Sequence, residues 1–175
     1  MYRSAWNILQ EKYNDKFFYG CVAHALNLLF GDIMSLHISN NTFEFMKDLQ
    51  NDAIDIVKFF KNHHQFNFAL RYHMREEKRI QLVTPGATRW ASFYYCLLSI
   101  VSNLQLLTDL VSNLNFIEVT GLLAKEIRIK IRSIILNIDW INNLKLAIDI
   151  LYPVSKAIKM FQSDSVPISD IYKCY

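Results

Sequence analysis

The chain has little glycine, proline or cysteine for its length of 175 residues. Its four Gly and three Pro are too few for a low-complexity or disordered chain. The cysteines, Cys21, Cys96 and Cys174, are odd in number and far apart. That pattern excludes a disulfide-stapled scaffold and is typical of a reducing compartment, so we expect a nuclear or cytoplasmic, intracellular location.

Strong charge and long apolar runs are also missing. The net charge of +3 permits a nucleic-acid partner without requiring one. Met1 is followed by polar and aromatic residues rather than by the apolar core of a signal peptide. The most apolar window, residues 91–107, contains several polar side chains, so we interpret it as a buried helix and not a membrane span. We therefore expect no membrane partner, and we expect no small-molecule substrate.

Apolar and aromatic residues are abundant, at 52% and 14% of the chain. This length and composition predict one packed, mostly helical domain. Periodicity and capping residues predict helices over residues 3–13, 22–34, 42–61, 88–111 and 121–137, and from 138 until Pro153 interrupts or kinks the last one.

Three of these helices have a definite apolar stripe. The expected inward-facing residues are Ala25, Leu28, Leu29 and Ile33 in the second helix, Met46, Leu49, Ala53, Ile56 and Phe60 in the third, and Trp90, Tyr94, Leu97, Val101, Leu104, Leu107 and Val111 in the fourth. Residues 121–137 instead show a basic face. The stripes predict helices packed around a common core.

Residues 17–21 are short, aromatic and interrupted by glycine, which favours a buried strand. A single strand cannot form a sheet, because its backbone groups need neighbouring strands. Either the chain is nearly all-helical, or its partner strands lie outside this polypeptide. The second alternative describes a piece of a larger α/β fold.

Residues 62–84 are polar and rich in histidine and basic side chains. One interpretation is a solvated, charged connection on the surface. The other is a phosphate-contacting surface in which Tyr72 and His73 are interleaved among cations. The candidate phosphate contacts are His63, His64, Arg71 and Arg75.

Cys21 and His24 stand three residues apart where the predicted strand gives way to a helix. A structural zinc site needs four ligands in closely spaced pairs, and no other cysteine or histidine repeats this spacing. A thiol-imidazole pair would need a third orienting group, and none is evident nearby. We therefore favour packing or a supporting role for both residues.

Thr88, Arg89 and Trp90 follow a Pro-Gly turn. Thr88 is placed to cap a helix, and the free N–H groups of a helix start attract anions. Arg89 adds a guanidinium that suits phosphate, and Trp90 offers a face for stacking on an unpaired base. Trp90 also lies on the apolar stripe, so a core position is the competing interpretation.

Four segments, in this order and spacing, resemble the core of hAT-superfamily DNA transposases and of related transposase-like domain-of-unknown-function proteins. They are AWNILQEKYNDKFFYGCVAHALNLLFGDI, VKFFKNHH, LVTPGATRWAS and LYPVSKAIKMFQSDSVPISDIY. The resemblance implies a ribonuclease H-like α/β core interrupted by an all-helical insertion. It places residues 1–36 in part of that core, 37–87 in a helix and basic connection, and 88–175 in the insertion region.

In that family, two Asp and one Glu bind the Mg²⁺ or Mn²⁺ ions that cut DNA. The resemblance implies that His24, Arg89 and Trp90 lie near the active site and contact the DNA end. It also implies that the three carboxylates lie before residue 1 and after residue 175, so we assign no catalytic residue, metal ligand or cofactor to this chain.

The leading hypothesis is a truncated or remnant transposase core that is catalytically inactive, with at most residual DNA binding. One alternative is a domesticated helical protein-interaction module that self-associates. The other is an incomplete gene model of an active transposase.

Overall fold

The computed structural model describes residues 7–9, 11–13, 22–35, 44–86 and 91–161 of the chain. Every regular element in these ranges is helical, which confirms the prediction of a mostly helical protein. Residues 7–9 and 11–12 are helical. The elements that follow are α2 (Val22–Ser35), α3 (Glu44–Asn62), α4 (His64–Glu76), α5 (Ala91–Ser102), α6 (Leu104–Ser112), the 3₁₀ turn η1 (Leu114–Phe116), α7 (Leu122–Ile135) and α8 (Ile138–Phe161). The strand predicted at residues 17–21 lies outside the described residues.

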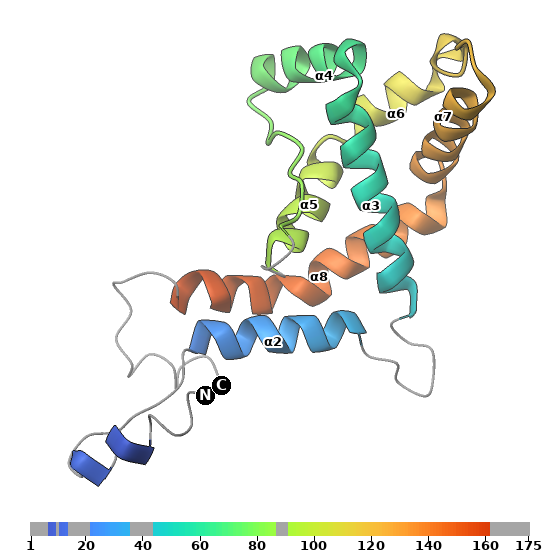
Figure 1. Ribbon diagram of the computed structural model, residues 1–175. Helices are drawn as coiled ribbons and strands as arrows, with labels where there is room; N and C mark the ends of the chain where they lie inside the picture. Colours follow the sequence, from blue (N-terminus) through green and yellow to red (C-terminus); the bar gives the residue numbers. More distant parts are fainter. Residues whose placement is uncertain (1–6, 10, 14–21, 36–43, 87–90, 162–175) are drawn as a thin grey trace.

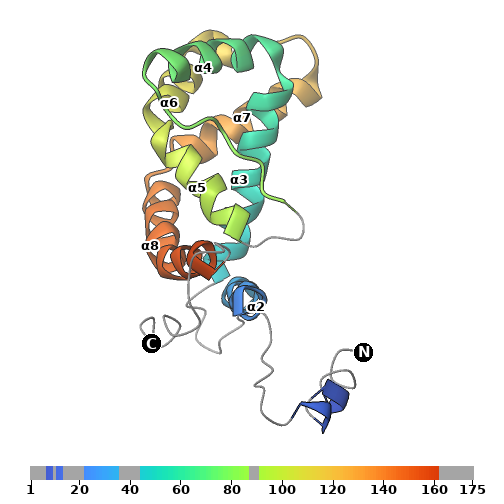
Figure 2. The same ribbon diagram turned by 90° about the vertical axis from the view of Figure 1, so that its left-hand side faces the viewer.

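Helix α3 occupies the centre of the arrangement. It runs from α4 at one end of the molecule to α2 and α8 at the other (Figures 1 and 2). Helix α8 packs against both α2 and α5, while α6 and α7 pack against each other beside the α4 end. The long helices α3 and α8 therefore contact each other and α2, α5 and α7, and α3 also contacts α4.

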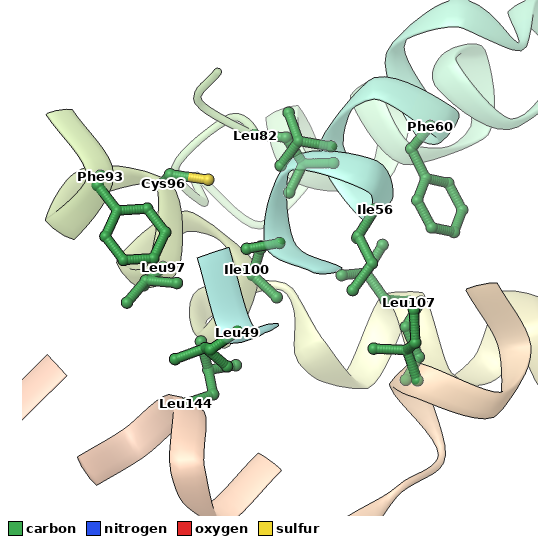
Figure 3. Packing of buried hydrophobic residues seen from close by; sticks show 14 of the residues in the cluster. Leu49, Ile56, Phe60, Leu82, Phe93, Cys96, Leu97, Ile100, Leu107 and Leu144 are labelled. Atoms are coloured by element: carbon green, nitrogen blue, oxygen red, sulfur yellow. The ribbon is translucent and has the colours of Figure 1, made fainter. Parts of the chain in front are cut away.

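The apolar stripe predicted for α3 is confirmed. Its members lie fully in the core, with no more than 2% of any side chain exposed: Met46, Leu49, Ala53, Ile56 and Phe60. Figure 3 shows several of them against side chains of α5, α6 and α8. Each fully buried Leu, Ile or Phe contributes about 1.5–3 kcal/mol by removing apolar surface from water, so α3 anchors the fold.

Helix α2 faces the core with different residues from those predicted. Phe30 is fully buried and Leu26 packs against the core, whereas 55% of Leu28 and 47% of Leu29 is exposed. Ala25 is exposed as well. Because α2 is apolar on most sides, its periodicity does not choose a face, and the contacts with α8 and α3 choose it instead. The side chain of Ile33 is outside the described set.

Residues 88–111 were predicted to form one helix, but the described part forms two. Helices α5 and α6 meet at Asn103 with a bend of 59°. The predicted stripe still faces inward at Tyr94, Leu97, Leu107 and Val111.

Within the described ranges no single helix is long and apolar enough to cross a membrane, although the bent pair of α5 and α6 meets the criteria of length and composition when its two halves are combined.

The bend follows from the hydrogen bonds of Asn103. Its backbone N–H donates to the carbonyl of Ile100 at 3.0 Å, which leaves the carbonyl of Ser99 without its helical donor. The buried Asn103 amide then donates to that carbonyl at 2.7 Å, and to the carbonyl of Ile80 at 2.7 Å. One side chain thus closes the end of α5 and fastens the extended segment 79–86 to it.

Proline 153 does not end the last helix. Helix α8 continues through it to Phe161, with Leu151, Ser155 and Ile158 buried on the inner side. A proline removes one helical hydrogen bond, which costs about 3 kcal/mol in an isolated helix. The packing of α8 against α2 and α5 offsets that loss, so α8 is not interrupted at this residue, and a kink there, the other predicted outcome, stays a prediction.

Residues 62–84, expected to be a charged connection, contain the helix α4. Its inner side buries Leu70 and Met74. Two backbone hydrogen bonds close its last turn. The Arg79 N–H donates to the Met74 carbonyl at 2.8 Å, and the Lys78 N–H donates to the Arg75 carbonyl at 3.2 Å. Lys78 has a φ of 52°, so it holds the left-handed position that glycine usually occupies at a helix end.

Candidate nucleic-acid interface on α4

The outer face of α4 carries two parallel rows of side chains, each with a spacing of four residues. The first row is His64, Phe68, Tyr72 and Glu76, and the second is Asn67, Arg71 and Arg75. Residues four apart lie above one another on a helix, and the two rows are neighbours because their members are also three apart. Rings therefore lie along one row and guanidinium groups along the next.

These side chains and Lys61 line an open hollow of about 670 Å³, which we call the α4 groove. Phe68 and Tyr72 are exposed over 77% and 57% of their surfaces. Neither ring contributes to the core, and large exposed rings of this kind often mark a binding surface. The groove thus combines apolar faces with cations that are open to solvent.

The charges in the α4 groove favour an anion. Lys61, Arg71 and Arg75 outnumber the one acidic residue of the lining, Glu76. In the part of the chain that the structure describes, neither Arg71 nor Arg75 forms an ion pair, whereas Arg79 pairs with Glu77 and Lys130 pairs with Asp55. Both guanidinium groups remain available for phosphate or carboxylate oxygens.

Hydrogen bonds hold one end of the groove in place. The Lys61 ammonium donates to the Thr84 hydroxyl at 2.9 Å, and the Asn67 amide donates to the Lys61 carbonyl at 2.7 Å. A second hollow of about 330 Å³ adjoins the groove and shares Lys61, Asn67 and Arg71 with it. The wall between the two hollows is therefore set by the junction of α3, α4 and segment 79–86.

The candidate phosphate contacts are not all on this surface. His64, Arg71 and Arg75 line the α4 groove. His63 instead lies between α3 and α7, where its ring packs 4.1 Å from the ring of Phe59 and its Nδ1 is 2.8 Å from the Phe59 carbonyl. His73, the next residue after Tyr72, lines a different hollow beside α6.

The other candidate DNA contacts are not brought to the groove. His24 is exposed on α2, at the opposite end of α3 from α4 (Figure 1). Arg89 and Trp90 lie outside the described residues, as does Cys21. The described structure therefore joins three of the seven predicted contacts into one surface.

The basic face expected on α7 is partly occupied by contacts within the protein. The Lys130 ammonium lies 2.7 Å from the Asp55 carboxylate, and this hydrogen bond and the charge of Asp55 raise the pKa of Lys130. Arg128 donates to the carbonyl of Phe116 at 3.0 Å and lies over the ring of Phe66. These two cations hold α7 against its neighbours, which makes α4 the more available basic surface.

Groups for metal or thiol chemistry are not assembled in the described ranges. No set of three or more His, Cys, Asp or Glu side chains there is placed to hold a metal ion. Cys96 is fully buried, and burial raises the pKa of its thiol to about 12 despite the opposing effect of Lys61. This thiol is protonated at neutral pH and acts as a small apolar side chain.

Comparison of the chain with protein-family models, curated proteins and solved structures finds no match. The candidate interface therefore rests on its own geometry. Sequence reasoning missed Phe68 and Asn67, although the four-residue spacing from His64 to Glu76 was present as a signal. That spacing has meaning only on a helix, and the sequence predicts no helix within residues 62–84.

Proposed function

We propose that this chain is a helical remnant of an hAT-type transposase core that binds nucleic acid through the α4 groove without cutting it. The resemblance of its four sequence segments supports the ancestry, and it assigns no metal-binding carboxylate to residues 1–175. The single observation that carries the binding is the pair of rows on α4. There, Arg71 and Arg75, which form no ion pair with any described residue, line an open hollow beside two exposed rings.

The proposal predicts that DNA affinity falls when the two arginines are removed. The double substitution Arg71→Ala and Arg75→Ala should weaken binding to end-labelled DNA about tenfold, and should lower the slope of log affinity against log salt concentration by about 1–2. Alanine preserves the helix, and both side chains are exposed. Fluorescence anisotropy at several salt concentrations measures both quantities.

A matched control removes the same charge elsewhere. Lys145 and Lys159 are exposed on α8, which is remote from α4. The variant Lys145→Ala, Lys159→Ala should keep the parent affinity and salt slope. Equal losses in both double variants would show that net charge, and not the groove, binds DNA.

Metal-dependent nicking of the labelled duplex in Mg²⁺ or Mn²⁺ would contradict the binding-only role.

A protein-interaction module is the second candidate function. Leu114, Leu122 and Leu123, near η1 and the start of α7, are exposed over 70%, 75% and 71% of their surfaces. Apolar side chains exposed to this extent favour association with a second copy or another protein. A stable dimer in light scattering, together with an absence of salt-dependent DNA binding, would replace the first proposal with this one.

A further inference from the structure

The spacing at which Phe68 and Tyr72 leave α4 favours one kind of nucleic acid over another. Phe68 and Tyr72 are four residues apart on α4, and a helix rises about 1.5 Å per residue, so the two rings are attached about 6 Å apart along the axis. A strand within a duplex advances only about 3.4 Å per nucleotide. The spacing at which the two rings are attached is therefore wider than a base stack, and it favours two bases that are unstacked from each other.

The exposure of the two rings also favours a nucleic acid whose bases are unpaired and unstacked. An aromatic side chain stacks on the flat face of a base, and a duplex covers those faces by stacking its own base pairs. An unpaired, extended strand leaves the faces open. Phe68 and Tyr72 reach into solvent without support from the core, so they are accessible to such bases.

Each ring has a cation beside it. Arg71 follows Phe68 by three residues, and Arg75 follows Tyr72 by three, so the ring-and-guanidinium unit occurs twice along the groove. Successive nucleotides of a strand repeat in the same way, with one base and one phosphate each. Lys61 extends the positive lining beyond the first unit, and the imidazole of His64 lines the same end of the groove.

We propose that the α4 groove binds single-stranded nucleic acid, with Phe68 and Tyr72 stacking on two bases and Arg71 and Arg75 contacting the phosphates. This inference rests on the proposed function and specifies the ligand class of the same surface. An acidic peptide would use the two arginines but would gain nothing comparable from the two rings.

The test separates rings from charges. The variant Phe68→Ala, Tyr72→Ala keeps all the cations, and it should bind single strands of thymidylate and of uridylate at least about tenfold more weakly. Its affinity for a duplex, and for a sugar-phosphate strand that lacks bases, should stay at the parent value. Tight binding of either the thymidylate or the uridylate strand supports the inference, because the rings contact bases and not sugars.

Two further variants serve as controls. Tyr152 is 51% exposed on α8 with the Lys156 ammonium 5.9 Å from its ring centre, so Tyr152→Ala removes a similar ring-and-cation pair from another surface and should have no effect. The variant Phe68→Leu, Tyr72→Leu keeps apolar bulk but loses the flat faces, and it should bind as weakly as the alanine variant. Far-UV circular dichroism confirms that each variant is folded.

Three outcomes have distinct meanings. If the ring variants bind the single strands as tightly as the parent does, while Arg71 and Arg75 are still required, the inference fails and the proposed function stands. If polyglutamate displaces the strands at equal charge concentration, the groove is an acidic-protein surface and the inference fails. If no nucleic acid binds through the two arginines, the proposed function itself fails.

Discussion

At the scale of single residues, Asp52 is in an unfavourable electrostatic position. It lies on α3 between Asp48 and Asp55 and is partly buried. Burial raises the pKa of its carboxyl group, and the charges of Asp55 and Asp48 add to this effect, while Lys130 and the indole of Trp140 oppose it. The folded protein therefore holds the proton of Asp52 more tightly than the unfolded chain does.

This environment predicts that Asp52→Asn stabilises the protein in a pH-dependent way. A raised carboxyl pKa means that stability is lost as the pH rises above the ordinary value of 3.8 and through the raised pKa. The substitution removes that loss, so it should raise Tm by about 1–2 °C at neutral pH and have no effect well below the ordinary pKa. Thermal unfolding across a pH series measures the difference.

Asp149 provides the control, because it is exposed on α8. The variant Asp149→Asn makes the same chemical change on the surface and should leave the pH profile of Tm close to that of the parent. A lower Tm for Asp52→Asn at neutral pH would show that the attraction to Lys130 outweighs burial.

At the scale of elements, the α5–α6 bend depends on one amide. Ser99 and Asn103 are both fully buried, and the Ser99 hydroxyl accepts a hydrogen bond from the Val83 N–H at 3.0 Å. Together with the bond that the Asn103 side chain donates to the Ile80 carbonyl, this fixes segment 79–86 along α5. A segment with no helix or strand of its own is thus held by side chains.

Asn103→Ala should therefore destabilise the whole domain. It leaves the carbonyls of Ile80 and Ser99 without their donor, and an unsatisfied buried polar group costs about 1–3 kcal/mol. Urea unfolding should show this as a lower midpoint with an unchanged slope. Asn142→Ala, on the exposed side of α8, is the matched control and should change the midpoint little. An unchanged midpoint for Asn103→Ala would show that water replaces the amide.

The elements differ in how far the sequence reveals them. Helix α3 was predictable because its apolar and polar residues are segregated at helical spacing, and its five stripe residues are buried as expected. Helix α4 was not, because its ends carry no recognisable signal. His63 makes no side-chain cap at the start, and Lys78 takes the place of the usual glycine at the end.

The candidate site, like α4 itself, could be predicted from the sequence only in part. The basic character of residues 62–84 was visible, and it placed His64, Arg71 and Arg75 correctly on a surface. The separation of His63 from His64 was not visible, since His63 is the extended residue between α3 and α4, and tertiary packing decides where its ring lies. The contribution of Phe68 likewise depends on knowing that the segment is helical.

At the scale of the whole molecule, one core joins both ends of α3. Side chains from α3, α5, α6 and α8 meet around Leu97 and Ile100, and Cys96 lies among them with no exposed surface (Figure 3). A reagent can reach this thiol only when the helices separate. The reactivity of Cys96 therefore reports on opening of the whole domain rather than on local motion.

We expect slow thiol labelling at neutral pH in a variant in which Cys21 and Cys174 are serine. The remaining thiol, Cys96, is buried and has a pKa of about 12, so the reactive thiolate is scarce in the folded state. The labelling rate should rise steeply across the urea transition, together with loss of helical circular dichroism. Fast labelling well before that transition would show that α5 separates locally from the core.

Helix α4 leaves the body of the protein and returns to nearly the same point. The Lys61 ammonium and the Thr84 hydroxyl, which are 23 positions apart in sequence, hydrogen bond at 2.9 Å across the two ends of this excursion. Leu70 and Met74 attach its inner side to the core, while Phe68, Arg71, Tyr72 and Arg75 of the outer rows are exposed. The exposed residues of α4 can therefore be substituted to suit another ligand, while the helices beneath them keep their fold.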